Sequence, residues 1–377
     1  MLLTELRRGA VVGLVFVVAC LYAATAATAQ EKSVKPGSRP EAWRGVHVMA
    51  WGLAGGPEGL APLKEAVEKV LAPLGVNVIV FEVGYNYAYK SHPELIQTKF
   101  ITRAEARDLA RFCRAHGIRV IPQLNCLGHQ SWRNTLYPLL AQYRDLEEPP
   151  DCEPAKYWRE PRSWCPLHPA INPIAFALMD ELIEAFEADA FHVGMDEVMV
   201  IASKNCPRCK DKTPAEVFAR AVNDYHRHLV GDKKVTMLMW GDRLIDGRAT
   251  KYDGWSASRN GTAAAVDMIP KDIIICDWHY EQRADYPSLR YFQDKGFRVW
   301  PAGWDNVGAT KALIACARRN ATDRMLGHLC TTWVLEPGGF ARAILGQRDP
   351  PLVTQRAAQS AAACQAAMEE LARGAAK

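Results

Sequence analysis

The sequence has no block of basic residues and only one long hydrophobic run, and each absence excludes a class of protein. Lysine and arginine are scattered along the 377 residues, and the formal net charge is only +4. Nucleic-acid-binding proteins usually concentrate their positive charge in one stretch or on one face, so no nucleic acid is expected as a partner. After the N-terminal run, no second segment is long and apolar enough to suggest a membrane span.

Cysteine is too sparse for a disulfide-built scaffold, and glycine is wrongly placed for a dinucleotide-binding fold. Eleven cysteines in this length exclude a small disulfide scaffold and remain compatible with one or two disulfides. Cys126, Cys276 and Cys330 lie at the ends of apolar runs and are predicted to be buried thiols. No glycine-rich phosphate-binding loop follows the first expected strand, which argues against a dinucleotide-binding fold.

Two pairs of cysteines lie in expected loops. Cys152 and Cys165 bracket a proline-rich loop and are candidates for a disulfide, while Cys206 and Cys209 form the sequence CPRC. No second pair of cysteines or histidines lies at the spacing of a zinc ribbon. The sequence therefore favours a local disulfide or free thiols over a zinc site at CPRC.

The first 29 residues resemble a signal peptide. Two arginines precede an apolar run over residues 11–24, and residues 27–29 are small enough for a cleavage site. Export to the periplasm or to the outside of the cell is expected, with residues 30–43 as a linker. The sequence VVAC also resembles a lipoprotein cleavage box, which would leave the protein anchored to a membrane through a lipid on Cys20.

The remaining chain alternates apolar runs with amphipathic helical stretches. The eight apolar runs that we expect to be strands cover residues 45–51, 76–83, 118–124, 190–195, 235–240, 272–278, 297–304 and 327–333. Thr102 and Thr213 are expected to begin helices, Gly117 to end one, and residues 352–373 to form a closing helix. Eight alternations with continuously apolar strands favour an α/β fold of the (β/α)8 TIM-barrel type over a doubly wound sheet, spanning residues 44–377.

The stretch AFHVGMDEVMV, residues 190–200, carries the strongest chemical signal. Strand alternation places His192 and Asp196 on one face and the apolar residues on the other. The adjacent carboxylates Asp196 and Glu197 are costly to bury, so we expect them at the strand's carboxyl end, where a barrel carries its active site. The alternative is an exposed strand end that forms a salt bridge.

Polar and aromatic residues also follow the other expected strands. In a barrel these positions face one cavity. Four tryptophans at four strand ends favour a sugar as ligand, because a pyranose packs its apolar face on an aromatic ring while its hydroxyls pair with polar side chains. The expected substrate-binding residues are Glu82, His129, His192, Trp240, Asp242, Trp278, Tyr280, Trp304 and Trp333. The long segment 125–171, with one expected short helix around residues 132–143, is predicted to cover the site.

FHVGMDEV resembles the His-x-Gly-x-Asp-Glu signature of glycoside hydrolase family 20, the β-N-acetylhexosaminidases. IPQLNCLGHQ, WCPLHP, MLMWGD and WHY resemble further segments of that family in the same order, and the likeness runs from about residue 44 to residue 333. The subgroup that the chain resembles most is the single-domain hexosaminidase D type. Two departures stand out: the usual arginine after the first strand has no match near residues 51–52, and Gln123 replaces a carboxylate.

The resemblance implies retaining hydrolysis of terminal N-acetylglucosamine or N-acetylgalactosamine, in which the substrate's own 2-acetamido group attacks the anomeric carbon. Glu197 would be the general acid and base, and Asp196 would orient the acetamido group and stabilise the positive charge. Tyr280 would donate to the acetamido oxygen. Trp240, Trp278, Trp304 and Trp333 would form the walls of the sugar pocket. Glu82 and Asp242 would bind sugar hydroxyls. His129 and His192 would orient the two carboxylates. A buried core histidine is an equal alternative for His192, and no cofactor or metal is implied.

Two other functions stay open. A metal-dependent barrel hydrolase or isomerase would use the five strand-end candidates His129, His192, Asp196, Glu197 and Asp242 as ligands, although no His-x-His or Glu-x-x-His pair is present. The missing arginine leaves room for a barrel that binds carbohydrate with little or no hydrolysis.

Overall fold

The structure is a computed structural model that describes residues 42–375, apart from 51, 52, 54–58, 133, 134, 150–161, 335, 337, 351 and 352. The expected signal peptide, Cys20 and Cys152 lie outside the described residues. The expected linker ends before residue 43, because Trp43 is already the first residue of a strand. Within the described ranges no helix combines the length and the hydrophobicity that a membrane crossing needs.

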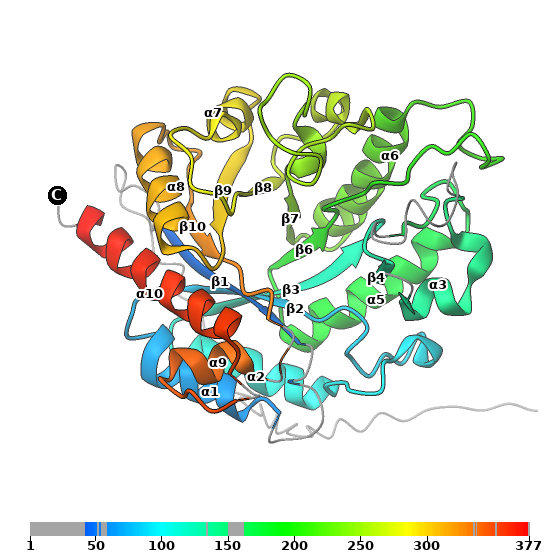
Figure 1. The fold of residues 1–377 in the computed structure, drawn as a ribbon. Helices are drawn as coiled ribbons and strands as arrows, with labels where there is room; N and C mark the ends of the chain where they lie inside the picture. Colours follow the sequence, from blue (N-terminus) through cyan, green and yellow to red (C-terminus); the bar gives the residue numbers. More distant parts are fainter. Residues whose placement is uncertain are drawn as a thin grey trace, which may run out of the picture. The chain divides into compact units, whose positions relative to one another are not determined.

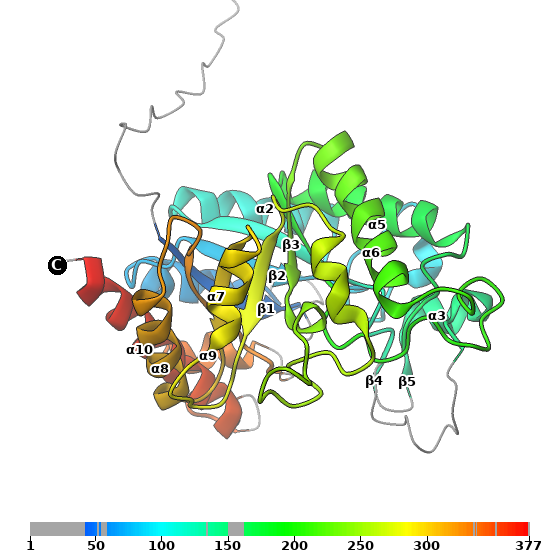
Figure 2. The ribbon, with the colours of Figure 1, turned by 90° about the horizontal axis from the view of Figure 1, so that it is seen from above.

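Eight parallel strands close into a barrel (Figures 1 and 2). They are β1 (Trp43–Met49), β2 (Val78–Glu82), β3 (Arg119–Cys126), β6 (Ala190–Gly194), β7 (Thr236–Trp240), β8 (Ile274–Trp278), β9 (Arg298–Gly303) and β10 (Gly327–Cys330). The strands follow chain order around the barrel, and β1 closes it by pairing with β10, Trp43 opposite Gly327. The eight expected strands and the (β/α)8 fold class are confirmed.

Helices surround the barrel. They are α1 (Ala61–Ala66) with its π-helical continuation η1 (Val67–Leu71), α2 (Arg103–Ala115), α5 (Ile171–Phe186), α6 (Pro214–His226) with its continuation η4 (Arg227–Asp232), α7 (Pro287–Asp294), α8 (Val307–Arg319), α9 (Gly339–Ile344) and α10 (Gln355–Ala375). Thr102 and Thr213 cap α2 and α6 with complete capping boxes, as expected. Gly117 follows α2 with a φ of 74°, the left-handed conformation that commonly ends a helix.

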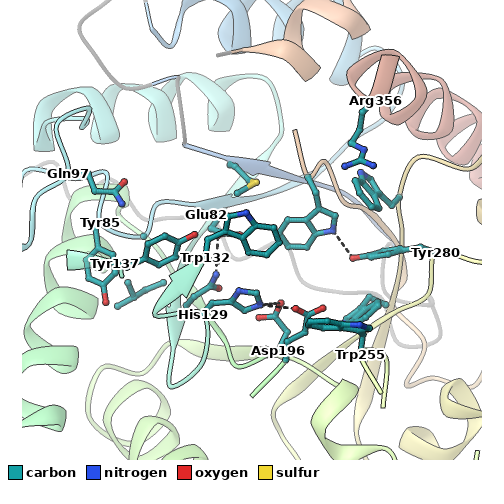
Figure 3. A pocket seen from close by; sticks show the side chains of 18 of the residues that line it. Glu82, Tyr85, Gln97, His129, Trp132, Tyr137, Asp196, Trp255, Tyr280 and Arg356 are labelled. Carbon is teal, nitrogen blue, oxygen red and sulfur yellow. Dashed lines mark hydrogen bonds and ion pairs between the residues drawn. The ribbon is translucent and has the colours of Figure 1, made fainter. Parts of the chain in front are cut away.

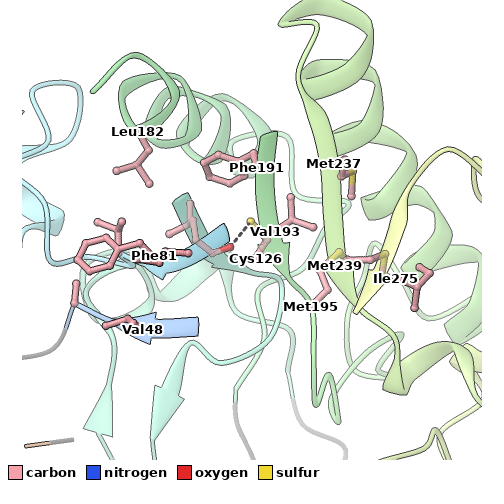
Figure 4. Packing of buried hydrophobic residues seen from close by; sticks show 14 of the residues in the cluster. Val48, Phe81, Cys126, Leu182, Phe191, Val193, Met195, Met237, Met239 and Ile275 are labelled. Atoms are coloured by element: carbon pink, nitrogen blue, oxygen red, sulfur yellow. Dashed lines mark hydrogen bonds between the residues drawn. The ribbon is translucent and has the colours of Figure 1, made fainter. Parts of the chain in front are cut away.

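The strand residues alternate between two buried layers. Inward side chains fill the barrel and include Val80, Ile121, Leu238, Ile274 and Trp300. Outward side chains pack against the helices (Figure 4), among them Phe81, Phe191, Val193, Met239 and Ile275. Each such side chain contributes about 1.5–3 kcal/mol by its burial. Because both faces of every strand are buried, the strands are continuous apolar runs in the sequence.

The segment between β3 and α5 contains small elements that the sequence did not define. They are the antiparallel strands β4 (Ser131–Trp132) and β5 (Thr135–Leu136), the helix α3 (Pro138–Gln142) and the 3-10 turn η3 (Arg144–Leu146). The helix expected over residues 132–143 is therefore wrong in extent, since Trp132 belongs to a strand. Pro138 occupies the first turn of α3, where its missing N–H costs nothing, and it marks the true start of the helix.

Candidate active site

A cavity of about 480 Å³ opens beside the carboxyl ends of the barrel strands (Figure 3). The described residues that line it are Met49, Glu82, Gly84, Tyr85, Gln97, Leu124, Asn125, His129, Trp132, Tyr137, Asp196, Glu197, Trp255, Trp278, Tyr280, Trp304, Trp333, Glu336 and Arg356. The lining thus combines a pair of adjacent carboxylates and a histidine with many aromatic rings, a composition that suits a sugar.

Asp196 and Glu197 follow β6 on a strained backbone. The φ angles of Gly194, Met195 and Glu197 are 67°, 71° and 49°. Residues other than glycine rarely adopt this left-handed region, and each such residue costs roughly 1–3 kcal/mol unless its surroundings hold it there. The strained turn brings both carboxylates to the cavity, although they are consecutive in the sequence.

His129 reaches the two carboxylates from the segment after β3, where Leu127 and His129 also have left-handed φ angles of 67° and 52°. The His129 Nε2 atom lies 3.2 Å from Asp196 Oδ2 and 3.4 Å from Glu197 Oε2. Burial alone would lower the pKa of His129, but the neighbouring carboxylates of Asp196 and Glu197 raise it well above its ordinary value. The two carboxylates therefore favour the protonated, cationic form of His129.

Asp196 has one oxygen engaged by His129 and one oxygen available. Burial alone would raise the pKa of Asp196, but His129 holds it below its ordinary value, so the carboxylate stays ionised. Its Oδ1 atom is buried and has no hydrogen-bond partner among the described residues. A buried acceptor without a partner costs about 1–3 kcal/mol, so the site is prepared for a donor from a ligand.

Asp242 supports the site from below and does not line the cavity. Its Oδ2 atom accepts hydrogen bonds from the Glu197 backbone N–H at 2.9 Å and from Arg243 Nε at 2.6 Å, and its Oδ1 atom accepts from Trp278 Nε1 at 3.1 Å. Burial raises the pKa of Asp242 to about 6, against the opposing charge of Arg243. Asp242, which was expected to bind sugar hydroxyls, lies outside the cavity lining and positions Glu197 and Trp278.

One wall of the cavity is aromatic. Trp278 stacks on Tyr280 with ring centroids 5.0 Å apart, and Trp304 meets Tyr280 edge-on at 5.3 Å. Trp333 Nε1 donates to the Tyr280 hydroxyl at 2.7 Å (Figure 3). The same hydroxyl also forms a side-chain hydrogen bond with Thr331. The structure places these four expected residues together.

Trp240 and His192 are buried beneath this wall and do not line the cavity. The Trp240 ring centroid lies 4.7 Å from that of His192 and 6.0 Å from that of Trp333. His192 Nδ1 accepts the Gly194 backbone N–H at 3.0 Å, and burial lowers the pKa of His192 to about 3, so the ring is neutral. Both residues were expected among the substrate-binding residues, but the structure places them beneath the cavity lining, because His192 points into the barrel below the strand's end.

These contacts also bear on the metal-dependent alternative. Asp242 already accepts three hydrogen bonds, and His192 lies beneath the cavity with one nitrogen engaged by Gly194. The five residues considered as ligands therefore do not present their atoms to one common point.

Glu82 ends β2 and lines the cavity within a polar network. Its Oε2 atom lies 2.9 Å from His47 Nε2 and accepts from Gln123 Nε2 at 3.0 Å, while its Oε1 atom accepts from Asn125 Nδ2 at 3.0 Å. Gln123 stands where the family resemblance leads one to expect a carboxylate. Its amide donates to Glu82, whereas a second buried carboxylate would repel it.

Several lining residues were not expected as site residues. They come from loops, from the short strand β4 and from the first turn of α10, and they include Gln97, Trp132, Tyr137, Trp255, Glu336 and Arg356. The Arg356 guanidinium lies 4.8 Å from the Trp304 ring centroid. Trp132 and Trp255 are 47% and 42% exposed, and large aromatics in polar loops were the available signal in the sequence.

Comparison with known proteins shows which family the sequence matches. The model of glycosyl hydrolase family 20, catalytic domain, matches residues 81–300, more than half of the chain. A beta-hexosaminidase of Vibrio furnissii is 25% identical over 187 residues, which are 49% of this chain and 28% of that protein. A beta-hexosaminidase of Emericella nidulans is 24% identical over 226 residues, 50% of this chain and 31% of that protein. The chain thus spans about a third or less of the length of these relatives.

Solved structures share the fold. The GH20 exo β-N-acetylglucosaminidase of Vibrio harveyi, in complex with N-acetylglucosamine, has a TM-score of 0.61 and 15% identity, and the match covers 90% of this chain and 57% of that one. The Flavobacterium johnsoniae chitobiase has a TM-score of 0.59 and 16% identity, with 88% and 52% covered. The family match includes β6 with its acid pair, His129 and the Trp278–Tyr280 wall, and the chain therefore belongs to glycosyl hydrolase family 20.

Proposed function

We propose that the protein is an exo-acting β-N-acetylhexosaminidase, which removes terminal N-acetylglucosamine or N-acetylgalactosamine from glycans by retaining, substrate-assisted hydrolysis. The observation that carries the proposal is Asp196: a buried, ionised carboxylate with one oxygen held by His129 and the other without a partner among the described residues. An acetamido N–H is the donor that such an oxygen lacks. The Vibrio harveyi relative, described as binding N-acetylglucosamine, supports the same substrate class.

Asp196 acts on the nucleophile. Its free oxygen accepts the acetamido N–H and turns the acetamido oxygen toward the anomeric carbon. The new C–O bond forms as the glycosidic C–O bond breaks, and positive charge spreads over the resulting oxazolinium-like ring. An ionised Asp196 stabilises this charge more in the transition state than in the ground state. The Tyr280 hydroxyl, polarised by Trp333, donates to the acetamido oxygen and fixes its direction.

Glu197 acts on the leaving group. Its proton passes to the glycosidic oxygen as that bond breaks, and the same carboxylate then removes a proton from the water that opens the cyclic intermediate. Asp242 fixes the Glu197 backbone, so the acid is held while its side chain faces the cavity. The aromatic wall packs against the sugar ring and excludes bulk water.

A pair of aryl β-glycosides tests the proposal. The N-acetyl-β-glucosaminide and N-acetyl-β-galactosaminide should be hydrolysed, whereas analogues with a 2-hydroxyl in place of the 2-acetamido group should not be, because they lack the nucleophile. Equal rates for both kinds of substrate would refute substrate assistance. Binding of N-acetylhexosamine without any release of aryl alcohol would instead support the carbohydrate-binding alternative.

We also propose that the protein is exported, supported by the arginine-led apolar run and the small residues at 27–29. Cell fractionation with N-terminal sequencing tests this. A mature chain that begins after Ala29 fits a secreted protein, a lipidated N-terminal Cys20 fits an anchored one, and an intact N-terminus in the cytoplasm contradicts export.

A further inference from the structure

Three cysteines and one glutamate from two loops meet in the interior, away from the cavity. Cys206 and Cys209 lie in the loop after β6, while Glu148 and Cys165 lie in the segment after β3. Their four potential ligand atoms all lie within 4.8 Å of one another, and all four residues are buried. None of them is among the residues that line the cavity.

The distances within this cluster do not correspond to a disulfide. Cys165 Sγ lies 3.3 Å from Cys209 Sγ and 3.6 Å from Cys206 Sγ, and Cys209 Sγ lies 3.3 Å from Glu148 Oε2. A disulfide would bring two sulfurs to about 2.05 Å. In a tetrahedral site with Zn–S bonds of about 2.3 Å, sulfurs are about 3.8 Å apart and a sulfur is about 3.6 Å from a carboxylate oxygen. The observed spacing is therefore close to that of a metal-binding tetrahedron.

The local backbone turns the sulfurs toward one another. Cys165 and Cys206 are each followed by a proline, which fixes φ and has no N–H. The first backbone N–H that can reach the cysteine sulfur therefore belongs to the residue after the proline. The backbone N–H of Leu167 bonds Cys165, and that of Arg208 bonds Cys206. Two separate Cys-Pro-x turns thus present their sulfur atoms in the same way.

Further contacts orient the remaining ligands. The Ser203 backbone N–H donates to Glu148 Oε1 at 2.6 Å, which leaves Oε2 pointing at Cys209. Arg208 Nε donates to Cys165 Sγ at 3.4 Å and brings a positive charge to the edge of the cluster. Metal ligands are generally held by such outer partners.

The four ligand atoms suit a divalent cation with an affinity for sulfur. Three thiolates and a carboxylate would bury four negative charges, and burial without a counter-charge is strongly unfavourable. A divalent ion removes most of this cost, and thiolate ligands select zinc over magnesium or calcium.

We propose that Glu148, Cys165, Cys206 and Cys209 form a structural zinc site that joins the segment after β3 to the loop after β6. Four protein ligands leave no open position, as in structural zinc sites. The same two segments carry His129 on one side and Asp196 and Glu197 on the other, so the ion fixes the separation of the acid pair from its histidine. The sequence argued against zinc at CPRC because the other two ligands come from a distant loop and not from a second nearby pair.

Metal analysis of the full-length protein tests the site. Protein purified from zinc-supplemented medium without chelators should contain about one zinc ion per chain. The variants Cys206→Ser and Cys209→Ser should lose it, while Cys113→Ala, which changes a buried cysteine of α2 outside the cluster, should retain it. Replacement by cobalt(II) should give a thiolate-to-metal charge-transfer band and the strong visible bands of tetrahedral coordination.

Three results would overturn the proposal. The first is wild-type protein without bound metal even after incubation with zinc, and the second is a disulfide among the three cysteines in the non-reduced protein. The third is a cobalt derivative without the charge-transfer band. If the serine variants do not fold, the wild-type metal content and the cobalt spectrum decide the question. None of these measurements uses a glycoside, so failure of the zinc site and failure of the proposed hydrolase activity are distinguishable.

Discussion

Asp196 and Glu197 are neighbours in the chain with different surroundings. The Asp196 side chain is 12% exposed and the Glu197 side chain 20% exposed, and His129 lies slightly closer to Asp196. One side-chain oxygen of Asp196 is buried without a hydrogen-bond partner among the described residues, whereas Glu197 is held through its backbone by Asp242. This difference lets two adjacent carboxylates perform separate tasks.

Changing each carboxylate to its amide should separate these tasks. Glu197→Gln removes the transferable proton, so hydrolysis of substrates with poor leaving groups should fall by about 10²–10⁴-fold. An activated aryl leaving group should restore much of that loss. Asp196→Asn should lower kcat for both kinds of substrate with a smaller change in KM, because an amide cannot stabilise a cation. The measurement is a series of aryl glycosides of graded leaving-group acidity, and an identical response of the two variants would contradict the assignment.

The charge of His129 should appear in the pH dependence of stability. Its pKa is raised in the folded protein, so its contribution is fully present below its unfolded pKa and is lost as the pH rises through the folded pKa. We expect His129→Asn, which tolerates the left-handed backbone, to cost on the order of 2 kcal/mol near neutral pH and progressively less at alkaline pH.

Urea unfolding of this variant at several pH values measures the difference. His226→Asn, which removes an exposed pair with Asp272, is the control and should change stability by less than about 1 kcal/mol. A cost at position 129 that is constant with pH would mean that the ring is neutral.

At the level of the elements, the buried strands could be predicted from the sequence, whereas the short elements within loops could not. All eight strands were predicted, because strands buried on both faces stand out as apolar runs. The hairpin β4–β5 and the true extent of α3 were not, since short loop elements depend on contacts with the rest of the fold. The same limit applies to Trp132, Trp255 and Arg356, which reach the cavity from the hairpin β4–β5, a loop and a helix end. The sequence placed His192 on the inward face of its strand. It could not show how far below the cavity the side chain lies, because that depends on where the strand ends within the barrel.

The turn that ends β6 should be very sensitive to one added methyl group. A Cβ at Gly194 would lie 2.4 Å from Asn125 Oδ1 and 2.9 Å from Asn125 Cα, at a φ of 67°. Gly194→Ala should therefore cost about 2–4 kcal/mol, from backbone strain and from overpacking against β3. Gly117→Ala is the matched control, because its φ is 74° and nothing lies within 4 Å of the added atom.

Chemical unfolding of both glycine variants gives their free energies of unfolding and separates the steric clash with Asn125 from the backbone strain. The control should lose only about 1 kcal/mol, the cost of a left-handed alanine. Similar losses at the two positions would show that the contact with Asn125 relaxes easily.

For the barrel as a whole, the closing helix α10 both packs against the barrel and contributes a residue to the cavity. It packs against α8, α9 and β10 (Figure 1). Its buried face includes Ala357, Cys364, Ala367 and Met368, while its first turn supplies Arg356 to the cavity. The closing helix was predicted from the sequence, but its contribution to the cavity was not, because that depends on where the helix begins relative to Trp304.

Loosening this helix should destabilise the entire barrel. Met368 is 1% exposed, so Met368→Ala should cost about 2–5 kcal/mol, while Glu369→Ala on the outer face should cost less than about 0.5 kcal/mol. Thermal unfolding followed by far-ultraviolet circular dichroism and by residual activity measures the effect. Both signals should shift together, and loss of activity at a lower temperature than loss of helix would show that α10 detaches by itself.

The aromatic wall also gives the protein an optical signal of its own. Among the tryptophans in the described part of the chain, five line the cavity: Trp132, Trp255, Trp278, Trp304 and Trp333. A sugar that packs on these indoles displaces water from them and changes the polarity that their excited states experience. The intrinsic fluorescence of the unlabelled protein therefore reports occupancy of the cavity directly, also for ligands that are never cleaved and for variants that no longer turn over.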